Sequence, residues 1–344
     1  MIDHRLFAVC VGLSALALRT PATAQTTLPP LRFGSIGDCR VTNGATIPNC
    51  RVGYRTYGRL DDARSNTVLI PTWLLGRSED WNPLLGHDPL VDTTRFYVVV
   101  VDALGDGHSS SPSNTPSAQA AFEALTIGDM VESQYRLLTS QLGIHHLRAV
   151  VGFSMGGMQA IEWAVRHPSF VDKIVPIAGS PRVGVFDRLM WTAMLNEIED
   201  AQRAGVPVDS VWSRLAHMEM LFVQTPIGLN SRGMDSVTND VAVNARQYRS
   251  GWALEDYAAQ LRAIRGYDAT QKYGGDLRRA AGEVHARVLA VYSWDDHMVT
   301  AGPVAEFARL VHADTLSIGS SCGHVMVFCE QKRVGAAIRA FIAQ

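Results

Sequence analysis

The 344-residue sequence has no excess of basic residues. Its 31 lysines and arginines face 33 aspartates and glutamates, for a formal net charge of −2. Without a basic stripe, the chain lacks the electrostatic footprint of a nucleic-acid-binding protein. No apolar run in the body of the chain reaches the length of a spanning helix, and no cluster has metal-ligand spacing. We therefore expect no nucleic-acid partner, no membrane contact by the mature chain, and neither a metal nor a cofactor.

The first residues differ from the rest of the chain. Arg5 precedes an apolar run at 6–18, and the small residues Ala22-Thr23-Ala24 follow it. A basic start, a short apolar core and an A-x-A ending are typical of a secretory signal peptide. We expect residues 1–24 to be cleaved and residues 25–344 to act in the periplasm or outside the cell. The alternative is a buried first helix.

Cysteine is scarce, and export changes how it is interpreted. Removal of residues 1–24 leaves Cys39, Cys50, Cys322 and Cys329, an even number in a compartment that permits disulfides. Cys39 and Cys50 flank Asn43-Gly44, a strong turn signal, so we expect them to face each other across a hairpin. Of three possible connectivities we predict the two local pairs, Cys39 with Cys50 and Cys322 with Cys329. Four unpaired buried thiols are the alternative.

Short apolar strands alternate with helices along the chain. The expected strands are at 67–72, 96–102, 147–151, 171–178, 288–293 and 314–318, and expected helices at 125–142, 303–311 and 332–343. This alternation predicts an α/β fold with an open, doubly wound, mostly parallel sheet. Between about 185 and 275 no strand is expected. Helices at 189–204 and 252–267, with an irregular segment between them, indicate a helical cap inserted into a single domain.

The segment Gly152-Phe153-Ser154-Met155-Gly156 lies between one of these strands and a helix. A G-x-S-x-G pattern in a strand-to-helix turn is typical of a nucleophile elbow. The glycines keep Cβ atoms from clashing in the strained turn, and the free N–H groups of the helix face any anion formed at the serine. The pattern predicts Ser154 as a nucleophile. A glycine-rich packing turn is the alternative.

A serine nucleophile needs a base, and the base needs a third group that holds its tautomer. In α/β-hydrolases the acid and then the histidine follow the serine along the chain. Asp295-Asp296 follows the strand at 288–293, and Gly323-His324 lies between the last strand and the last helix. We predict Asp296 as the acid and His324 as the base. We prefer Asp296 to Asp295 because the acid, one residue, two apolar residues and then proline or threonine is the usual pattern after that strand.

The oxyanion formed during acyl transfer needs two backbone N–H donors. The residue directly after the nucleophile, Met155, supplies the first. The loop after the strand at 67–72 should supply the second, and Leu74 or one of its direct neighbours is the candidate.

The run Ser154-Met155-Gly156-Gly157-Met158-Gln159 is more specific than an elbow alone requires. With the segments at 54–58, 102–105, 126–131, 142–144, 162–164 and 255–270, it resembles the homoserine O-acetyltransferase family of the α/β-hydrolase superfamily. The likeness covers most of residues 25–344. It implies an α/β-hydrolase fold, the triad and oxyanion residues named above, and a possible homodimer.

Three segments depart from that family. Its acetyltransferases carry an aspartate directly after the catalytic histidine, where this chain has Val325. The loop Trp73-Leu74-Leu75-Gly76 and the segment Ser180-Pro181-Arg182-Val183 also differ from the family's segments. The aspartate meets the amino-acid acceptor, and an acyl-enzyme without a positioned acceptor transfers its acyl group to water.

These features favour an exported serine acyl-hydrolase that acts on a small-molecule ester through an acyl-enzyme. One alternative is an O-acetyltransferase that moves an acyl group from acyl-coenzyme A to homoserine or a similar alcohol. A catalytically silent binding protein is the other.

Overall fold

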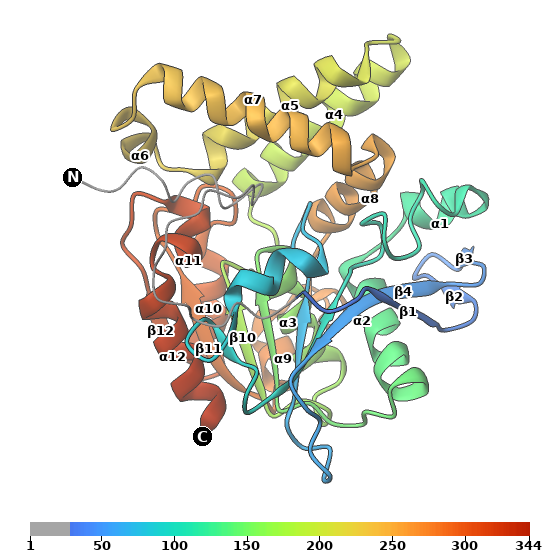
Figure 1. The fold of residues 1–344 in the computed structure, drawn as a ribbon, viewed down its shortest axis with the longest axis vertical. Coiled ribbons are helices and arrows are strands. Elements are labelled where there is room, and N and C mark those ends of the chain that lie inside the picture. Colours follow the sequence, from blue (N-terminus) through green and yellow to red (C-terminus); the bar gives the residue numbers. More distant parts are fainter. Residues whose placement is uncertain (1–27) are drawn as a thin grey trace.

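The structure, a computed structural model, describes residues 28–344, so the predicted signal peptide at 1–24 lies outside the described residues. One large sheet holds eight strands. In spatial order these are β1 (Arg32–Ser35), β4 (Arg51–Tyr57), β8 (Tyr97–Val101), β5 (Thr67–Pro71), β9 (Ala149–Phe153), β10 (Lys173–Ile177), β11 (Arg287–Tyr292) and β12 (Asp314–Ser317). Pairing is antiparallel from β1 to β8 and parallel from β8 to β12 (Figure 1). The predicted fold class is confirmed.

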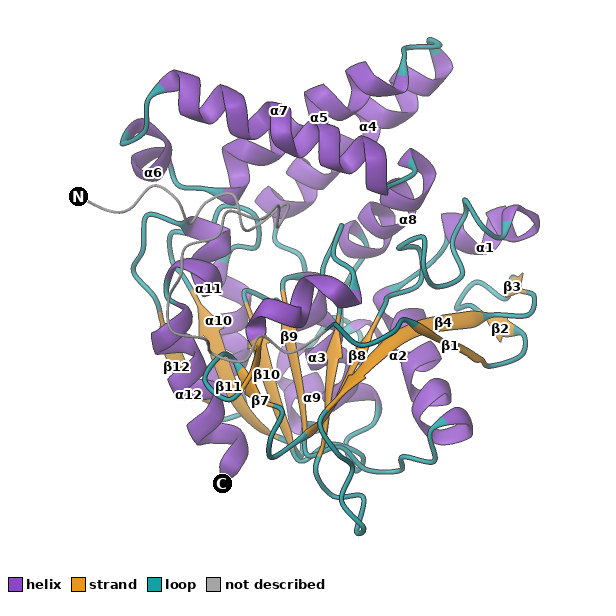
Figure 2. Cartoon of the chain, in the orientation of Figure 1, coloured by secondary structure: helices purple, strands orange, loops and turns teal. Residues whose placement is uncertain are grey.

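Both faces of the sheet are buried, which explains its continuous apolar strands. In β5, Leu69 packs into one hydrophobic cluster, whereas Val68 and Ile70 pack into the other. The first cluster lies under α2 (Ile127–Arg136), α3 (Met155–Arg166), α9 (Leu277–Gly282) and α10 (Ala301–Leu310), and the second under η2 (Ser78–Leu84), α11 (Met326–Cys329) and α12 (Gln331–Ala343). Figure 2 shows these helices on the two sides of the strands.

The helix predicted at 125–142 begins and ends differently in the structure. Thr126 is the N-cap of α2, and its side chain accepts a hydrogen bond from the backbone N–H of Asp129 at 3.1 Å. Asp129 accepts in return from the Thr126 backbone at 2.9 Å, so both free N–H groups are satisfied. After Arg136 the chain continues as a π-helical turn, η4 (Leu137–Gln141).

The segment between β10 and β11 forms a helical cap. It consists of α4 (Val185–Arg203), α5 (Val208–Val223), α6 (Pro226–Asn230), α7 (Met234–Gly251) and α8 (Leu254–Arg265). These helices lie together at the end of the sheet that carries Ser154 (Figure 2). The prediction of an irregular segment between 204 and 252 is wrong, because α5, α6 and α7 fill it. Helix α7 carries apolar residues at helical spacing, Val237, Val241, Ala245 and Tyr248, and this stripe packs against the core.

The remaining elements are short. The pairs β2 (Cys39–Arg40) with β3 (Thr46–Ile47) and β6 (Leu85–Gly86) with β7 (Val91–Asp92) form small ladders, and η3 (Pro116–Ala118), α1 (Gln119–Glu123), η5 (Gln271–Tyr273) and η6 (Gly323–Val325) are single turns. None of the helices in residues 28–344 is long and apolar enough to cross a membrane.

The two predicted cysteine pairs have different outcomes in the structure. Cys322 is joined to Cys329 by a disulfide that brackets η6. Cys39 and Cys50 are brought together by the β2–β3 hairpin, as the turn signal predicts, but both are free, buried thiols. Their side chains share a hydrogen bond, so the predicted Cys39–Cys50 disulfide is not formed here. The pair at 322 and 329 spans a short loop, whose closure costs little chain entropy.

Candidate active site

Ser154 occupies the sharp turn between β9 and α3. Its φ is 56° and its ψ is −121°, in the left-handed half of backbone space that side chains rarely adopt. A Cβ on Gly152 would lie 2.0 Å from the Gly156 carbonyl oxygen, and one on Gly156 would lie 2.5 Å from the Pro71 oxygen. The turn therefore forms only with glycine at both positions, which is the physical content of the G-x-S-x-G pattern.

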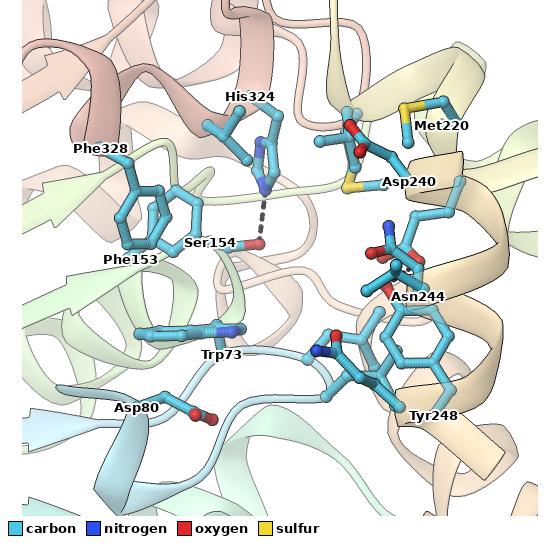
Figure 3. Close-up of a pocket in the computed structure, with 18 of the residues that line it drawn as sticks. Trp73, Asp80, Phe153, Ser154, Met220, Asp240, Asn244, Tyr248, His324 and Phe328 are labelled. Atoms are coloured by element: carbon cyan, nitrogen blue, oxygen red, sulfur yellow. Dashed lines mark hydrogen bonds between the residues drawn. The ribbon is translucent and has the colours of Figure 1, made fainter. Parts of the chain in front are cut away.

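The structure brings Ser154, His324 and Asp296 into one hydrogen-bonded chain. His324 Nε2 lies 2.8 Å from Ser154 Oγ, and Nδ1 lies 2.8 Å from Asp296 Oδ2 (Figure 3). With the carboxylate at Nδ1, that nitrogen carries the proton and Nε2 is left to accept one from the serine. Asp296 and His324 are each 3% exposed. Such an arrangement can generate a serine nucleophile.

The local backbone holds Asp296 in place. Its Oδ1 accepts hydrogen bonds from the backbone N–H groups of Met298 at 2.8 Å and Val299 at 2.9 Å. Its other oxygen is thereby turned toward His324. Asp295, the alternative, is exposed. The structure therefore places Asp296, and not Asp295, against the histidine.

The two oxyanion candidates lie on neighbouring segments. Met155 is the first residue of α3, where backbone N–H groups have no partner within the helix. Leu74 lies in the tight turn from Trp73 to Gly76, which is closed by a 2.9 Å hydrogen bond from the Gly76 N–H to the Trp73 oxygen. Leu74 lines the same cavity as Ser154.

A buried amide joins these two segments. Gln159 Nε2 donates to the Thr72 oxygen at 3.0 Å and to the Met155 oxygen at 3.2 Å. Gln134 donates to Gln159 Oε1 and accepts from Trp163 Nε1 at 2.8 Å. The chain of side chains thus holds the loop after β5 against the start of α3. Gln159 belongs to the most specific run of the sequence, but its role could not be derived from the sequence, because the partners come from three separate segments.

Ser154 lies at a cavity of about 310 Å³ between the sheet and the cap. Trp73, Phe153 and Phe328 form an aromatic wall on one side of the serine, and Asp240, Asn244 and Tyr248 lie on the other (Figure 3). The three rings pack edge to face, with centroids 5.6–6.1 Å apart. One wall of the cavity is therefore aromatic, whereas the opposite wall combines polar side chains with Met220 and Val243.

Two carboxyl groups in the cavity wall have raised pKa values. Burial raises the pKa of Glu219 to about 7, although the Tyr248 hydroxyl donates a hydrogen bond to it. Burial also raises the pKa of Asp80 to about 6, despite a 2.8 Å hydrogen bond from the Arg77 N–H. Raised pKa values in a cleft are common at functional sites.

Folding also gathers a cluster that the sequence spacing did not suggest. Potential ligand atoms of Glu79, Asp102 and His108 lie within 4.8 Å of one another. Asp102 accepts hydrogen bonds from the Ser78 N–H at 2.7 Å and its hydroxyl at 2.9 Å, and Glu79 pairs with Arg55 at 3.1 Å. Both carboxylates therefore have protein partners. We interpret the cluster as a structural contact that holds η2 in place, and we do not assign it as a metal site.

Residues 67–209 match a protein-family model described as alpha/beta hydrolase fold. The chain is 38% identical over 333 residues to a probable esterase of Corynebacterium glutamicum, covering 87% of this chain and 90% of the relative. It is 26% identical over 365 residues to a homoserine O-acetyltransferase of Haloarcula marismortui, covering 90% of each. The chain belongs to the homoserine O-acetyltransferase-like family of α/β-hydrolases.

This family contains esterases as well as acyltransferases. An ethyl acetate hydrolase of Pseudomonas veronii is 28% identical over 331 residues, covering 92% of this chain and 95% of the relative. The solved structure of an acetylester hydrolase from Corynebacterium glutamicum superposes with a TM-score of 0.83 at 25% identity, covering 92% of this chain and 96% of that one. The predicted family and enzymatic character are confirmed, and the protein is an α/β-hydrolase-family enzyme of the esterase or acyltransferase type.

The cap residues of the cavity were missed by sequence reasoning. They include Glu219 and Met220 on α5, and Asp240, Asn244, Gln247 and Tyr248 on α7. A signal for α7 was present, because polar residues recur at three- and four-residue spacing from 240 to 248. A polar stripe usually faces solvent, so only the packed structure shows that this one faces a cavity.

Proposed function

We propose that this protein is a serine esterase that hydrolyses short-chain esters through an acyl-enzyme. The observation that carries the proposal is the hydrogen-bonded chain from Ser154 through His324 to Asp296 at a cavity. In this mechanism His324 Nε2 takes the Ser154 proton as Oγ attacks the ester carbonyl carbon. The N–H groups of Met155 and Leu74 stabilise the oxyanion. His324 then protonates the leaving alcohol oxygen, which breaks the ester bond.

A water molecule completes the reaction in the same way. His324 takes a proton from water, the hydroxide attacks the acyl carbon, and the proton passes to Ser154 Oγ as the carboxylic acid leaves. Asp296 holds the imidazole tautomer throughout and stabilises the imidazolium. No cofactor is consumed.

Hydrolysis is favoured over transfer by Val325. It follows His324 directly, is 6% exposed and lines the cavity. An alkyl side chain at this position lacks the carboxylate that meets the amino-acid acceptor in the acetyltransferases, which favours water as the acceptor. The short acyl group is supported by the names of two similar proteins, an ethyl acetate hydrolase and an acetylester hydrolase.

The first test uses p-nitrophenyl acetate with and without homoserine. We expect ester cleavage that homoserine does not change, and a loss of about 10³-fold or more in kcat for Ser154→Ala. Homoserine-dependent acceleration with accumulation of O-acetylhomoserine would instead identify the O-acetyltransferase that the relative from Haloarcula marismortui suggests. Absence of cleavage, together with no fluorophosphonate labelling of Ser154, would identify a silent binding protein.

We also propose that the enzyme is exported. Arg5, the apolar run at 6–18 and the Ala22-Thr23-Ala24 ending support this, and the Cys322–Cys329 pair suits an oxidising compartment. Expression of the full chain should yield periplasmic protein whose intact mass matches that of residues 25–344, which begin with Gln25. Cytoplasmic protein that retains Met1 would contradict export without affecting the proposed reaction.

A further inference from the structure

The polar wall of the cavity comes from one face of α7. Asp240, Asn244, Gln247 and Gly251 line the cavity at spacings of four, three and four residues, and Val243 is the one aliphatic side chain of α7 among the described residues that line it. These spacings place them in one stripe along the helix. A helix that packs over a cavity normally turns an apolar stripe toward it, so a polar stripe in this place requires an explanation.

The stripe has unused hydrogen-bonding capacity. The Gln247 amide oxygen is buried and has no hydrogen-bond partner among the described residues. The Asn244 side chain, half-buried, has no hydrogen bond to any described residue either. A buried amide without a partner is costly, by roughly 1–3 kcal/mol. A ligand with hydroxyl groups would satisfy such amides on both their donor and acceptor sides.

Glu219 adds a carboxyl group to the same wall from α5. Its hydrogen bond from Tyr248 joins α5 to α7 and leaves further acceptor capacity on the carboxyl group. Among the described residues it forms no salt bridge, whereas Asp240 pairs with Arg232. The raised pKa of Glu219, about 7, means that it is partly uncharged at neutral pH. Two amides and such a carboxyl group suit an uncharged hydroxylated ligand better than a cation.

The position of His324 decides which half of the ester meets this wall. The leaving alcohol oxygen takes a proton from His324 Nε2, so the alcohol half of the ester must lie near this nitrogen. The cap contacts that side directly, because Thr225 Oγ1 donates to the Ser321 oxygen at 2.7 Å and the Val223 oxygen lies 3.0 Å from the Cβ position of Gly323. The aromatic wall, whose Phe153 ring also packs against His324 with centroids 5.1 Å apart, lies across the cavity from the α7 residues and suits the apolar acyl group (Figure 3).

From this arrangement we propose that Asn244, Gln247 and Glu219 bind the alcohol half of the substrate, and that this half carries free hydroxyl groups, as in a partly acetylated polyol or sugar. The inference rests on the proposed esterase function. It goes beyond that function because it assigns the cap residues a role and the substrate a class.

The test compares glycerol monoacetate with propyl acetate, which has the same carbon skeleton and no free hydroxyl. We expect the wild-type enzyme to favour glycerol monoacetate in kcat/KM by about tenfold or more, as one or two hydrogen bonds provide. Asn244→Leu and Gln247→Leu should each lower kcat/KM for glycerol monoacetate by about tenfold and leave propyl acetate within twofold. Thr238→Leu, exposed on the same helix and outside the cavity wall, is the matched control.

Several results would overturn the inference. Equal or better use of propyl acetate by the wild-type enzyme would do so, as would an equal loss on both substrates in the leucine variants. A preference for acetylcholine over glycerol monoacetate would show that the wall binds a cation. Ser154-dependent cleavage of p-nitrophenyl acetate accompanying any of these would leave the esterase function standing. If a leucine variant fails to fold, as thermal unfolding would show, Asn244→Ala and Gln247→Ala serve instead.

Discussion

At the residue scale, a few side chains bear most of the chemistry, and each depends on its immediate surroundings. Ser154 is held at an unusual backbone conformation, and His324 is oriented by Asp296, which is itself held by two backbone N–H groups. Glu219 is different, because its surroundings disfavour its charged form. Its titration should therefore be visible in the stability of the enzyme.

We predict that Glu219→Gln makes the protein less sensitive to alkaline pH. The folded-state pKa of about 7 lies above the usual value near 4.5, so the folded state holds a proton that the unfolded state releases between these values. Stability should fall as pH rises through this window. At pH 8 we expect the variant to be more stable than the wild-type protein by about 1–2 kcal/mol, with little difference at pH 4.5.

Urea unfolding at the two pH values measures this difference. Glu283→Gln, at an exposed position, controls for the loss of a surface charge. An equal effect of Glu219→Gln at both pH values would show that the carboxyl group is ionised normally.

At the element scale, the strand-to-helix turn and the cap helices set the shape of the site. The turn brings backbone segments into contact, since Gly156 packs against the Pro71 oxygen at the end of β5. The cap acts through α5 and α7, whose polar residues close the cavity from above the sheet. Close packing positions the strand-to-helix turn, whereas the cap helices contribute side chains that can form hydrogen bonds in the cavity.

We predict that Gly156→Ala both destabilises and inactivates the enzyme. The new Cβ would lie 2.5 Å from the Pro71 oxygen, so β5 and α3 must separate, at a cost of about 2 kcal/mol. That movement would displace the loop carrying Leu74 and lower kcat. Thermal unfolding and the p-nitrophenyl acetate assay measure the two effects.

Gly302→Ala is the matched control for this prediction. Gly302 lies in α10, and nothing lies within 4 Å of its Cβ position. Alanine there should leave activity unchanged and stabilise the helix by up to about 1 kcal/mol. If Gly156→Ala behaved like Gly302→Ala, the inference that the close approach of β5 and α3 requires glycine at position 156 would be wrong.

At the scale of the whole molecule, the site is assembled from parts that lie far apart in the chain. The loop after β5, the turn at Ser154, the cap, the loop after β11 and the segment at His324 all meet at one cavity. The last of these is bracketed by the disulfide between Cys322 and Cys329. A covalent link at that point restrains the base of the triad relative to the rest of the fold.

We predict that replacing both Cys322 and Cys329 by serine lowers stability by about 2 kcal/mol, the usual effect of a short closed loop. It should also lower kcat several-fold, because His324 lies inside the loop. Dithiothreitol should reproduce both effects in the wild-type enzyme and have no further effect on the double variant. A wild-type enzyme that dithiothreitol leaves unchanged, with no alkylation of these two cysteines after denaturation without reductant, would contradict the role of the link in positioning His324.

Local patterns were sufficient for the fold class and for the identity of the triad candidates. Apolar strands buried on both faces, the glycines around Ser154 and the positions of Asp296 and His324 after late strands are all properties of short segments. Backbone sterics and strand burial act within such segments, so they can be recognised without knowing the packing. The disulfide at 322 and 329 and the β2–β3 hairpin were predictable for the same reason.

The cavity was decided only by the tertiary structure. Nothing local distinguishes the stripe of Asn244 and Gln247 from a solvated helix face, so the spacing at 240–248 can indicate a helix but not what that helix faces. The link between Gln159 and Thr72, and the contact of Glu219 with Tyr248 in the cavity wall, join segments that are distant in the chain. Such contacts depend on how whole elements pack, and a periodic pattern in one element does not encode its partner.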